Sequence, residues 1–336
     1  MKLSSFVIFG VLRLLFVCGY NVNRETSSPA FKQAIERSMK QSIRVPIYFA
    51  AGVSVAIPVD AGSLATAPRT TSKRLQGPPK YWFHPKIHTF GNTGLLGAIH
   101  AALAPLVTKL IDFSAYRGEN VRITIAKGLR QKVGKANANV LDLCCGVGMS
   151  TRALQGAFQD AAVILGVDTS KEMIAMAELL SSDSELAKFL VDKPKRTFYG
   201  SCSPDFLVGN AEETNLPGGI FDLVTIMYSF HEVPHHGRYL ILREARRLLA
   251  DGCTLAVIDI SPNYEPSPTM LAGEPYVLEY KANIQKQLKA IRGFVDLRYE
   301  EVVAGHVGLW TLTRKKASVS SKVNQHHLGW LGGVFQ

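Results

Sequence analysis

The stretch that decides the fold is VLDLCCGVGMST, residues 140–151. It begins as an apolar run that carries one acid, Asp142, continues through Gly146 and Gly148, and ends in small hydroxyl residues. Glycine lets a backbone approach a ligand without a side chain in the way. The free N–H groups of a helix that begins there favour an electron-rich ligand group. We therefore expect a buried strand, a ligand-binding loop and a helix N-terminus, in that order.

Two common phosphate-binding loops do not fit this stretch. A Walker P-loop ends in Gly-Lys-Ser/Thr, and no lysine is present here. The dinucleotide fingerprint needs a third glycine where Thr151 stands. Asp142 at the strand end would repel a pyrophosphate, whereas it would suit a cofactor with a positive ammonium or sulfonium group. A nicotinamide oxidoreductase is therefore disfavoured.

A second acid, Asp168, ends the next apolar run, VILGVDTS, residues 163–170. In a doubly wound sheet, ligands bind at the C-terminal ends of the strands. A carboxylate in this position can accept hydrogen bonds from both hydroxyls of a ribose. A cationic amine at one loop and a ribose at the next describe S-adenosylmethionine, which the sequence predicts as the cofactor.

Strand-like apolar runs alternate with helix-like stretches along the chain. The five runs are Val140–Leu143, Ala162–Val167, Phe206–Val208, Leu223–Met227 and Thr254–Ile258. The helix-like stretches are Gly94–Leu110, interrupted by Pro105, then Asn120–Lys132, Ser170–Leu180 and Arg238–Leu249. Such alternation favours a parallel sheet with helices on both faces.

Two further strand candidates, Val295–Val303 and Val307–Thr313, are separated only by AGH. This connection is too short for a helical crossover, so the two must pair as an antiparallel hairpin. The predicted fold is therefore an α/β, Rossmann-like sheet of seven strands, five parallel and two in a terminal hairpin. The terminal hairpin also argues against a nicotinamide oxidoreductase.

The basic charge of the chain is concentrated at its N-terminus. Residues 1–80 hold 11 lysines and arginines against three acids, a net charge of +8, while the rest carries 27 against 24. The apolar run at residues 6–20 is broken by Arg13 and is shorter than the ~20 residues that span a bilayer. We expect a presequence and linker without a fold, addressed to a plastid in preference to a mitochondrion. A tail that makes peripheral contact with a membrane is the alternative.

The remaining chain divides into three parts. We expect a helical cap at 81–135, a cofactor-binding domain at 136–315 that contains a substrate-capping insertion at about 261–292, and a tail at 316–336. The five cysteines form no CxxC pair and no disulfide framework, which favours a reducing compartment such as a stroma or matrix.

Five segments carry a resemblance to a known family. They are LDLCCGVG, GVDTS, VGNAEETNLP, FDLVTIMYSFHEVP and RRLLADGCTLAVIDI, in this order. The chain resembles the class I, seven-stranded S-adenosylmethionine-dependent methyltransferases, of the methyltransferase-11 and ubiquinone/menaquinone-methyltransferase-like group. The resemblance covers roughly residues 81–315. The family usually has glycine where this chain has Cys144, which bears on how closely the backbone approaches the methionine end.

The resemblance implies a role for each matching position. The amino-acid end of the cofactor would be held by Asp142, Cys144, Gly146 and Gly148, the ribose by Asp168 and Thr169, and the adenine by Asn210 and Ala211. Met227 and Tyr228 would line the methyl-donor side, and Tyr116 would close over the cofactor unless it serves in ordinary packing.

The implied reaction is an in-line displacement, in which an electron-rich atom of the acceptor attacks the sulfonium methyl group. Because the leaving group is neutral, positioning can supply much of the acceleration. Where the acceptor must lose a proton, a general base helps. The candidate catalytic residues are Tyr228 and His231, with His231 as the base. A structural or helix-capping role for His231 is equally compatible with the sequence.

No metal site is predicted. His84 and His88 are four residues apart, but Pro85 lies between them and no carboxylates follow at matching spacing. Cys144 and Cys145 are adjacent in a strand-like segment, so their side chains should point to opposite faces.

The acceptor is expected to be a small apolar or aromatic molecule. The segments YWFHPKIHTFGNTG at 81–94 and SPNYEPSPTMLAGEPYVLEYKANIQKQL at 261–288 are rich in aromatic residues, although core packing would also explain them. Neither has an arginine–aromatic array for base stacking, so no nucleic-acid partner is expected. An RNA or protein methyltransferase, and a catalytically silent cofactor-binding fold acting as an assembly or regulatory partner, remain alternatives. The sequence leaves the oligomeric state and the methylated atom open.

Overall fold

The computed structural model describes residues 80–83, 91–182, 187, 190 and 202–316. The expected presequence before residue 80, both histidines of the pair His84 and His88, and the expected tail from residue 317 lie outside the described residues. The expectations for these segments therefore stay predictions.

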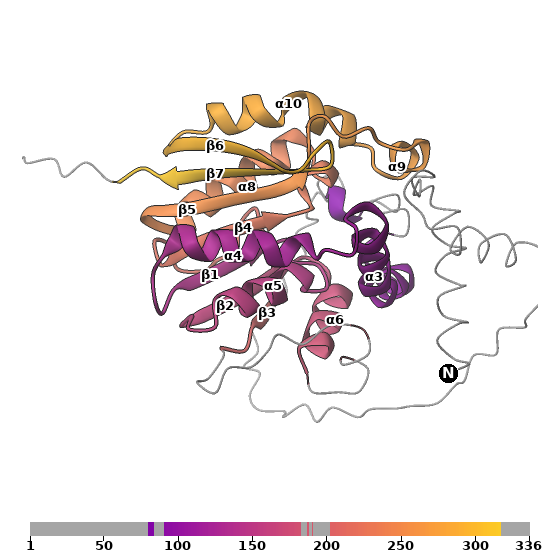
Figure 1. The fold of residues 1–336 in the computed structure, drawn as a ribbon, viewed down its shortest axis with the longest axis horizontal. Helices are drawn as coiled ribbons and strands as arrows, with labels where there is room; N and C mark the ends of the chain where they lie inside the picture. Colours follow the sequence, from indigo (N-terminus) through magenta and orange to yellow (C-terminus); the bar gives the residue numbers. More distant parts are fainter. Residues whose placement is uncertain (1–79, 84–90, 183–186, 188–189, 191–201, 317–336) are drawn as a thin grey trace, which may run out of the picture.

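Seven strands form one sheet in the order β3-β2-β1-β4-β5-β7-β6 (Figure 1). They are β1 (Asn139–Leu143), β2 (Val163–Asp168), β3 (Asp205–Val208), β4 (Phe221–Met227), β5 (Leu249–Ile260), β6 (Phe294–Val303) and β7 (Val307–Arg314). The first five strands pair in parallel, and β7 is antiparallel to both β5 and β6. The predicted sheet, with its terminal hairpin, is confirmed.

The helices connect the strands and cover both faces of the sheet. They are α3 (Gly94–Ala115), α4 (Val121–Val133), α5 (Met149–Ala157), α6 (Lys171–Ser181), α8 (His235–Leu248), α9 (Pro268–Gly273) and α10 (Val277–Ala290), with 3-10 turns η1 (Tyr81–Phe83) and η2 (Phe230–Glu232). Figure 1 shows α3 and α9 at one end of the sheet, beyond the strand ends rather than on a face.

The core has two layers because strand residues alternate between the faces of the sheet. Leu141 and Leu143 of β1 pack with buried side chains of α8 and α10. Val140 faces the opposite side and packs with Val121 and Leu154, from α4 and α5. Both faces are therefore apolar, as expected for a parallel sheet covered on both sides.

Three expectations need adjustment. The interruption predicted at Pro105 is wrong, because α3 runs unbroken from Gly94 to Ala115 with Pro105 inside it. Pro105 is itself buried within this helix. Within the expected cap, α4 instead covers a face of the sheet. Within the expected insertion, α10 buries Tyr280 in the core. Only the part of the insertion that precedes α10 can therefore cap a site.

The sheet has one topological switch point, between β1 and β4. From β1 the chain moves outward to β2 and β3, and then returns to the other side of β1 to form β4 and β5. In open α/β sheets the crevice at such a point, beyond the carboxyl ends of the strands, is where ligands bind. The loops after Leu143 and Met227 are therefore the place to look for a site.

Candidate functional site

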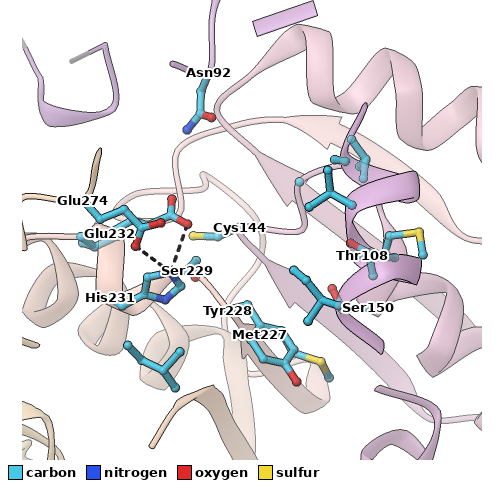
Figure 2. A pocket seen from close by; sticks show the side chains of 18 of the residues that line it. Asn92, Thr108, Cys144, Ser150, Met227, Tyr228, Ser229, His231, Glu232 and Glu274 are labelled. Atoms are coloured by element: carbon cyan, nitrogen blue, oxygen red, sulfur yellow. Dashed lines mark ion pairs between the residues drawn. The ribbon is translucent and has the colours of Figure 1, made fainter. Parts of the chain in front are cut away.

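A cavity of about 660 Å³ opens at this switch point. The loops that follow β1, β2, β3 and β4 form one side of it, and α3, η1 and the segment around α9 form the other. Figure 2 shows the cavity with side chains from both sides converging on it. The elements are far apart in the sequence, and the sheet topology brings them together.

Most of the predicted site residues lie at this cavity. Those that line it are Tyr116, Cys144, Gly146, Asp168, Thr169, Asn210, Ala211, Met227, Tyr228 and His231. Asp142 and Gly148 are not among the lining residues. The structure thus gathers ten of the twelve residues around one space, while their individual roles toward a ligand stay predictions.

Asp142 is fully buried in the sheet and does not reach the cavity. Its Oδ2 accepts hydrogen bonds from the hydroxyls of Ser150, at 2.8 Å, and Thr151, at 2.7 Å. Its Oδ1 accepts from the hydroxyl of Thr225 at 2.7 Å. Burial raises the pKa of Asp142, and the three hydroxyls oppose that shift. The predicted direct contact with a cationic group is therefore not supported, because this carboxyl instead fixes α5 and β4 against β1.

Asp168 lies at the cavity and joins the two loops that are expected to bind a cofactor. Its Oδ2 accepts the N–H of Gly146 at 2.9 Å, and its Oδ1 accepts the N–H of Ser170 at 2.9 Å. A carboxylate has acceptor sites for about four hydrogen bonds. Asp168 can therefore organise both loops and still bind ribose hydroxyls.

Gly146 and Gly148 have different tasks in the loop after β1. A Cβ on Gly146, whose φ is +53°, would meet nothing within 4 Å. A Cβ on Gly148, whose φ is +74°, would come within 2.8 Å of the Phe206 ring. Gly146 therefore leaves bare backbone facing the cavity, as a closely held cofactor requires, whereas Gly148 lets the helix pack closely.

Cys144 and Tyr228 have left-handed backbones at corresponding places, directly after β1 and β4. Their φ angles are +58° and +57°, a conformation that costs a side-chain-bearing residue about 1–2 kcal/mol. Both residues line the cavity. Such strain is typical of ligand-binding positions. The left-handed backbone also explains why a glycine would fit the position of Cys144.

Tyr228 presents its ring to the cavity, and the guanidinium of Arg122 lies 4.4 Å from the ring centroid. Its hydroxyl is buried and has no hydrogen-bond partner within the described part of the chain. Burial raises the pKa of Tyr228 to about 12. The hydroxyl therefore stays protonated at neutral pH.

His231 is held by a buried network of carboxylates. Its Nδ1 lies 2.5 Å from Oδ1 of Asp259, a residue with no exposed surface. The other oxygen of Asp259 accepts the backbone N–H groups of Phe230, at 2.7 Å, and His231, at 3.2 Å. The Nε2 atom lies 3.2 Å from Glu274 Oε2 and 3.5 Å from Glu232 Oε1, as the dashed lines in Figure 2 mark.

This network changes the expected chemistry of His231. Burial disfavours the charged ring, but the carboxylates of Asp259 and Glu274 outweigh burial and raise the pKa of His231 well above its usual value. Both ring nitrogens already face carboxylates, Nδ1 toward Asp259 and Nε2 toward Glu274 and Glu232. The predicted role as a general base is therefore not supported by this arrangement.

The sequence analysis did not identify Asp259, Glu232 or Glu274 as site residues. Asp259 carried a signal that could have been used, since it is an acid near the end of an apolar run, as Asp142 is. Glu232 is adjacent to His231, but nothing in the local pattern of Glu274 connects it with either residue.

The side of the cavity opposite the strand ends is mainly apolar. Helix α3 contributes Leu103, Val107 and Ile111, and η1 contributes Tyr81 and Trp82. The outer side of α3 is also apolar, with Leu95, Leu96, Ile99 and Phe113 exposed. Among the described residues, α3 alone has the length and apolar composition of a membrane-crossing helix.

Comparison with known proteins identifies the central part of the chain. Residues 141–257 match the family model described as a methyltransferase domain. The demethylmenaquinone methyltransferase of Bacillus licheniformis is 31% identical over 124 residues, which are 37% of this chain and 45% of that protein. The corresponding protein of Bacillus mycoides is 27% identical over 168 residues, covering 50% and 58%. The chain thus spans about half the length of the curated relatives it matches.

Among solved structures, the chain is similar to a magnesium protoporphyrin IX methyltransferase from Synechocystis PCC 6803 with bound S-adenosylmethionine. The two sequences are 18% identical, the TM-score is 0.39, and the match covers 58% of this chain and 80% of the other.

Proposed function

We propose that this chain, whose residues 141–257 form a methyltransferase domain of the S-adenosylmethionine-dependent class, transfers a methyl group to a small apolar or aromatic molecule. The observation that carries the proposal is the cavity at the switch point. On the side of the strand ends it has loops built for a cofactor, around Gly146 and Asp168, and on the opposite side it has a mainly apolar surface to which α3 contributes.

The chain's own residues fit the cofactor. Gly146 offers bare backbone beside open space, and Asp168 offers carboxylate oxygens at the neighbouring strand end. Asn210 and Ala211 lie on the loop after β3, further along the same edge of the sheet. The Oδ1 atom of Asn210 accepts the N–H of Glu212 at 3.0 Å, which fixes this loop. The amino acid, ribose and adenine parts would therefore be bound in that order.

The reaction depends on positioning. When bound, S-adenosylmethionine supplies an electrophilic methyl group on a sulfonium that leaves as a neutral thioether. The residues of the chain hold the acceptor in line with that methyl group and exclude water. Met227, the last residue of β4, and Tyr228, which follows it, line the cavity and can help to position the acceptor.

The lining of the acceptor end supports an apolar or aromatic acceptor. Leu103, Val107 and Ile111 of α3 form a hydrocarbon surface, and Tyr81 and Trp82 add aromatic rings. Pockets lined in this way, with few polar groups, are typical of small-molecule sites. The curated relatives are named for demethylmenaquinone, so quinols and phenols are the first acceptors to examine.

Calorimetric titration of the full chain with S-adenosylmethionine, S-adenosylhomocysteine and NAD tests the cofactor. We expect micromolar affinity for the first two and no binding of NAD. Asp168→Ala should weaken binding at least tenfold, because each charge-assisted hydrogen bond to a ribose hydroxyl contributes about 1.5–3 kcal/mol. Asp205→Ala, which removes an exposed acid at the start of β3, is the matched control.

Several results would contradict the proposal. Unchanged affinity in a folded Asp168→Ala protein would remove the ribose assignment, and NAD binding would remove the cofactor assignment. If the cofactor binds, methyl transfer to a panel of quinols, phenols and apolar amines should follow. Cofactor binding without turnover on any of them would favour the silent, regulatory alternative.

A further inference from the structure

Three side chains at the acceptor end of the cavity converge on one point: those of His231, Glu232 and Glu274 (Figure 2). One ligand atom from each lies within 4.8 Å of the other two. They come from η2 and from the segment between α9 and α10, which are about forty residues apart. All three residues line the cavity.

The spacing of these atoms fits coordination of a metal ion. Metal–nitrogen and metal–oxygen bonds of about 2.0–2.2 Å, at octahedral to tetrahedral angles, separate neighbouring ligand atoms by roughly 2.9–3.6 Å. The observed distances from His231 Nε2 are 3.2 Å to Glu274 and 3.5 Å to Glu232. An ion between the three atoms would need only small movements of flexible glutamate side chains.

The other nitrogen of His231 is held as in metal sites. Histidine ligands usually donate the second ring N–H to a carboxylate, which fixes the orientation of the ring. Here Nδ1 contacts Asp259 Oδ1 at 2.5 Å. Asp259 is itself fixed by the N–H groups of Phe230 and His231 and has no exposed surface. The ring is therefore locked with Nε2 pointing toward the two glutamates.

The charge of the cluster also calls for a cation. Three carboxylates surround one imidazole, and the exposed fractions of the side chains are 0% for Asp259, 9% for Glu232 and 13% for Glu274. A divalent ion bound to the neutral ring would place two positive charges among these mostly buried carboxylates.

We propose that His231, Glu232 and Glu274 bind a divalent metal ion, with its remaining coordination positions facing the cavity. One imidazole and two carboxylates form a mixed nitrogen and oxygen set that suits Zn²⁺, with Mn²⁺ as the next candidate. The acceptor then carries an oxygen or nitrogen that binds the ion within the cavity. This statement about the acceptor rests on the proposed function, whereas metal binding does not.

The test titrates the chelator-treated full chain with ZnCl₂, and separately with MnCl₂, by calorimetry. We expect one ion per chain with a Kd in the micromolar range or tighter. Glu274→Gln should weaken binding at least tenfold, because it replaces a carboxylate ligand by an amide of the same shape. The matched control is Glu265→Gln, since Glu265 lines the cavity from the loop before α9 but stands outside the cluster.

Titration of the same samples with S-adenosylhomocysteine separates the possible outcomes. A chain that binds S-adenosylhomocysteine but no metal at 1:1 would overturn the metal site and assign the carboxylates to an amine acceptor. Equal metal affinity in the Glu274→Gln and Glu265→Gln proteins would overturn it as well. Metal binding that is lost only in Glu274→Gln supports the site, even if S-adenosylhomocysteine fails to bind and the proposed function falls.

Discussion

The two ends of the cavity are built by different means. At the cofactor end, backbone N–H groups and small hydroxyls surround two carboxyls, as in the bonds from Gly146 and Ser170 to Asp168. At the acceptor end, charged side chains contact one another directly, with His231 between Asp259 and Glu274. The first end is assembled mostly from neighbouring strand–loop–helix units, and the second from distant segments.

This difference matters most for the two fully buried acids, Asp142 and Asp259. The partners of Asp142 are hydroxyls, which can either donate or accept a hydrogen bond. The partners of Asp259 are mainly backbone N–H groups, which can only donate. The cofactor end should therefore tolerate an amide in place of its buried carboxyl, and the acceptor end should not.

The largest expected effect follows from this contrast. Asp259→Asn should lower the free energy of unfolding by about 3–4 kcal/mol, because its NH₂ group must face at least one buried N–H donor. If it replaces Oδ1 it meets Ile260 N–H, and if it replaces Oδ2 it meets the N–H groups of Phe230 and His231. Urea unfolding measures the loss.

Asp142→Asn is the matched variant, with an expected loss of no more than about 1 kcal/mol. The new NH₂ group can donate to the hydroxyl of Thr225, whose own proton can turn to the carbonyl of Leu141, 3.4 Å away. The amide oxygen can still accept from Ser150 and Thr151. Equal losses of unfolding free energy in Asp259→Asn and Asp142→Asn would show that the kind of hydrogen-bond partner does not determine the cost of the substitution.

The same contrast decides what the sequence could predict. The strand order, the hairpin and the cofactor loops have local signals, such as apolar runs, turn glycines and an acid at a strand end. These signals led to Gly146 and Asp168, and the family resemblance led to Asn210; all three lie at the cavity. Local pattern sufficed for Gly146 and Asp168 because each is positioned by the strand that directly precedes it.

The acceptor end could not be predicted in the same way. Glu274 reaches His231 only because the chain after β5 folds back over the strand ends, a path that no local pattern encodes. The sequence pattern also did not show that the carboxyl of Asp142 would bond to buried hydroxyls instead of facing the cavity. A cluster whose members are separated by some forty residues becomes visible only when the fold is known.

An intermediate effect separates stability from binding at the cofactor end. Gly148→Ala should cost about 2 kcal/mol of stability, because the methyl group meets Phe206 at 2.8 Å and the backbone is left-handed. Gly146→Ala should cost only about 1 kcal/mol, because the methyl group meets nothing within 4 Å. That methyl group lies at the cavity, so the affinity for S-adenosylhomocysteine should fall at least tenfold. Thermal unfolding and calorimetry measure the two quantities, and an unaltered affinity in Gly146→Ala would contradict the cofactor-loop assignment.

The smallest effect tests whether the loop after β3, at the cofactor end, depends on a charged side chain of a helix. Glu244, on α8, reaches the loop after β3 and accepts both the N–H and the hydroxyl of Thr214, at 2.9 and 2.6 Å. It also accepts two hydrogen bonds from Arg247, at 2.7 and 2.8 Å. Although burial acts to raise its pKa, the bonds from Arg247 and Thr214 hold the pKa of Glu244 below its usual value.

Glu244→Gln should therefore lower stability by about 1 kcal/mol at neutral pH, a modest loss because Arg247 is half exposed. A lowered pKa stabilises the fold above the usual value of 4.5, and this contribution is lost as the pH falls through the lowered pKa. The difference from the wild type should thus be full at pH 7 and shrink below pH 4.5. Affinity for S-adenosylhomocysteine should change less than about threefold, because two backbone hydrogen bonds hold this loop independently of Glu244. The N–H of Gly209 donates to the carbonyl oxygen of Asp168 at 2.8 Å, and the N–H of Glu213 donates to that of Asn210 at 3.0 Å. A tenfold loss of this affinity would mean that the loop after β3, which carries Asn210, depends on a distant side chain. The contrast between the two ends of the cavity would then fail.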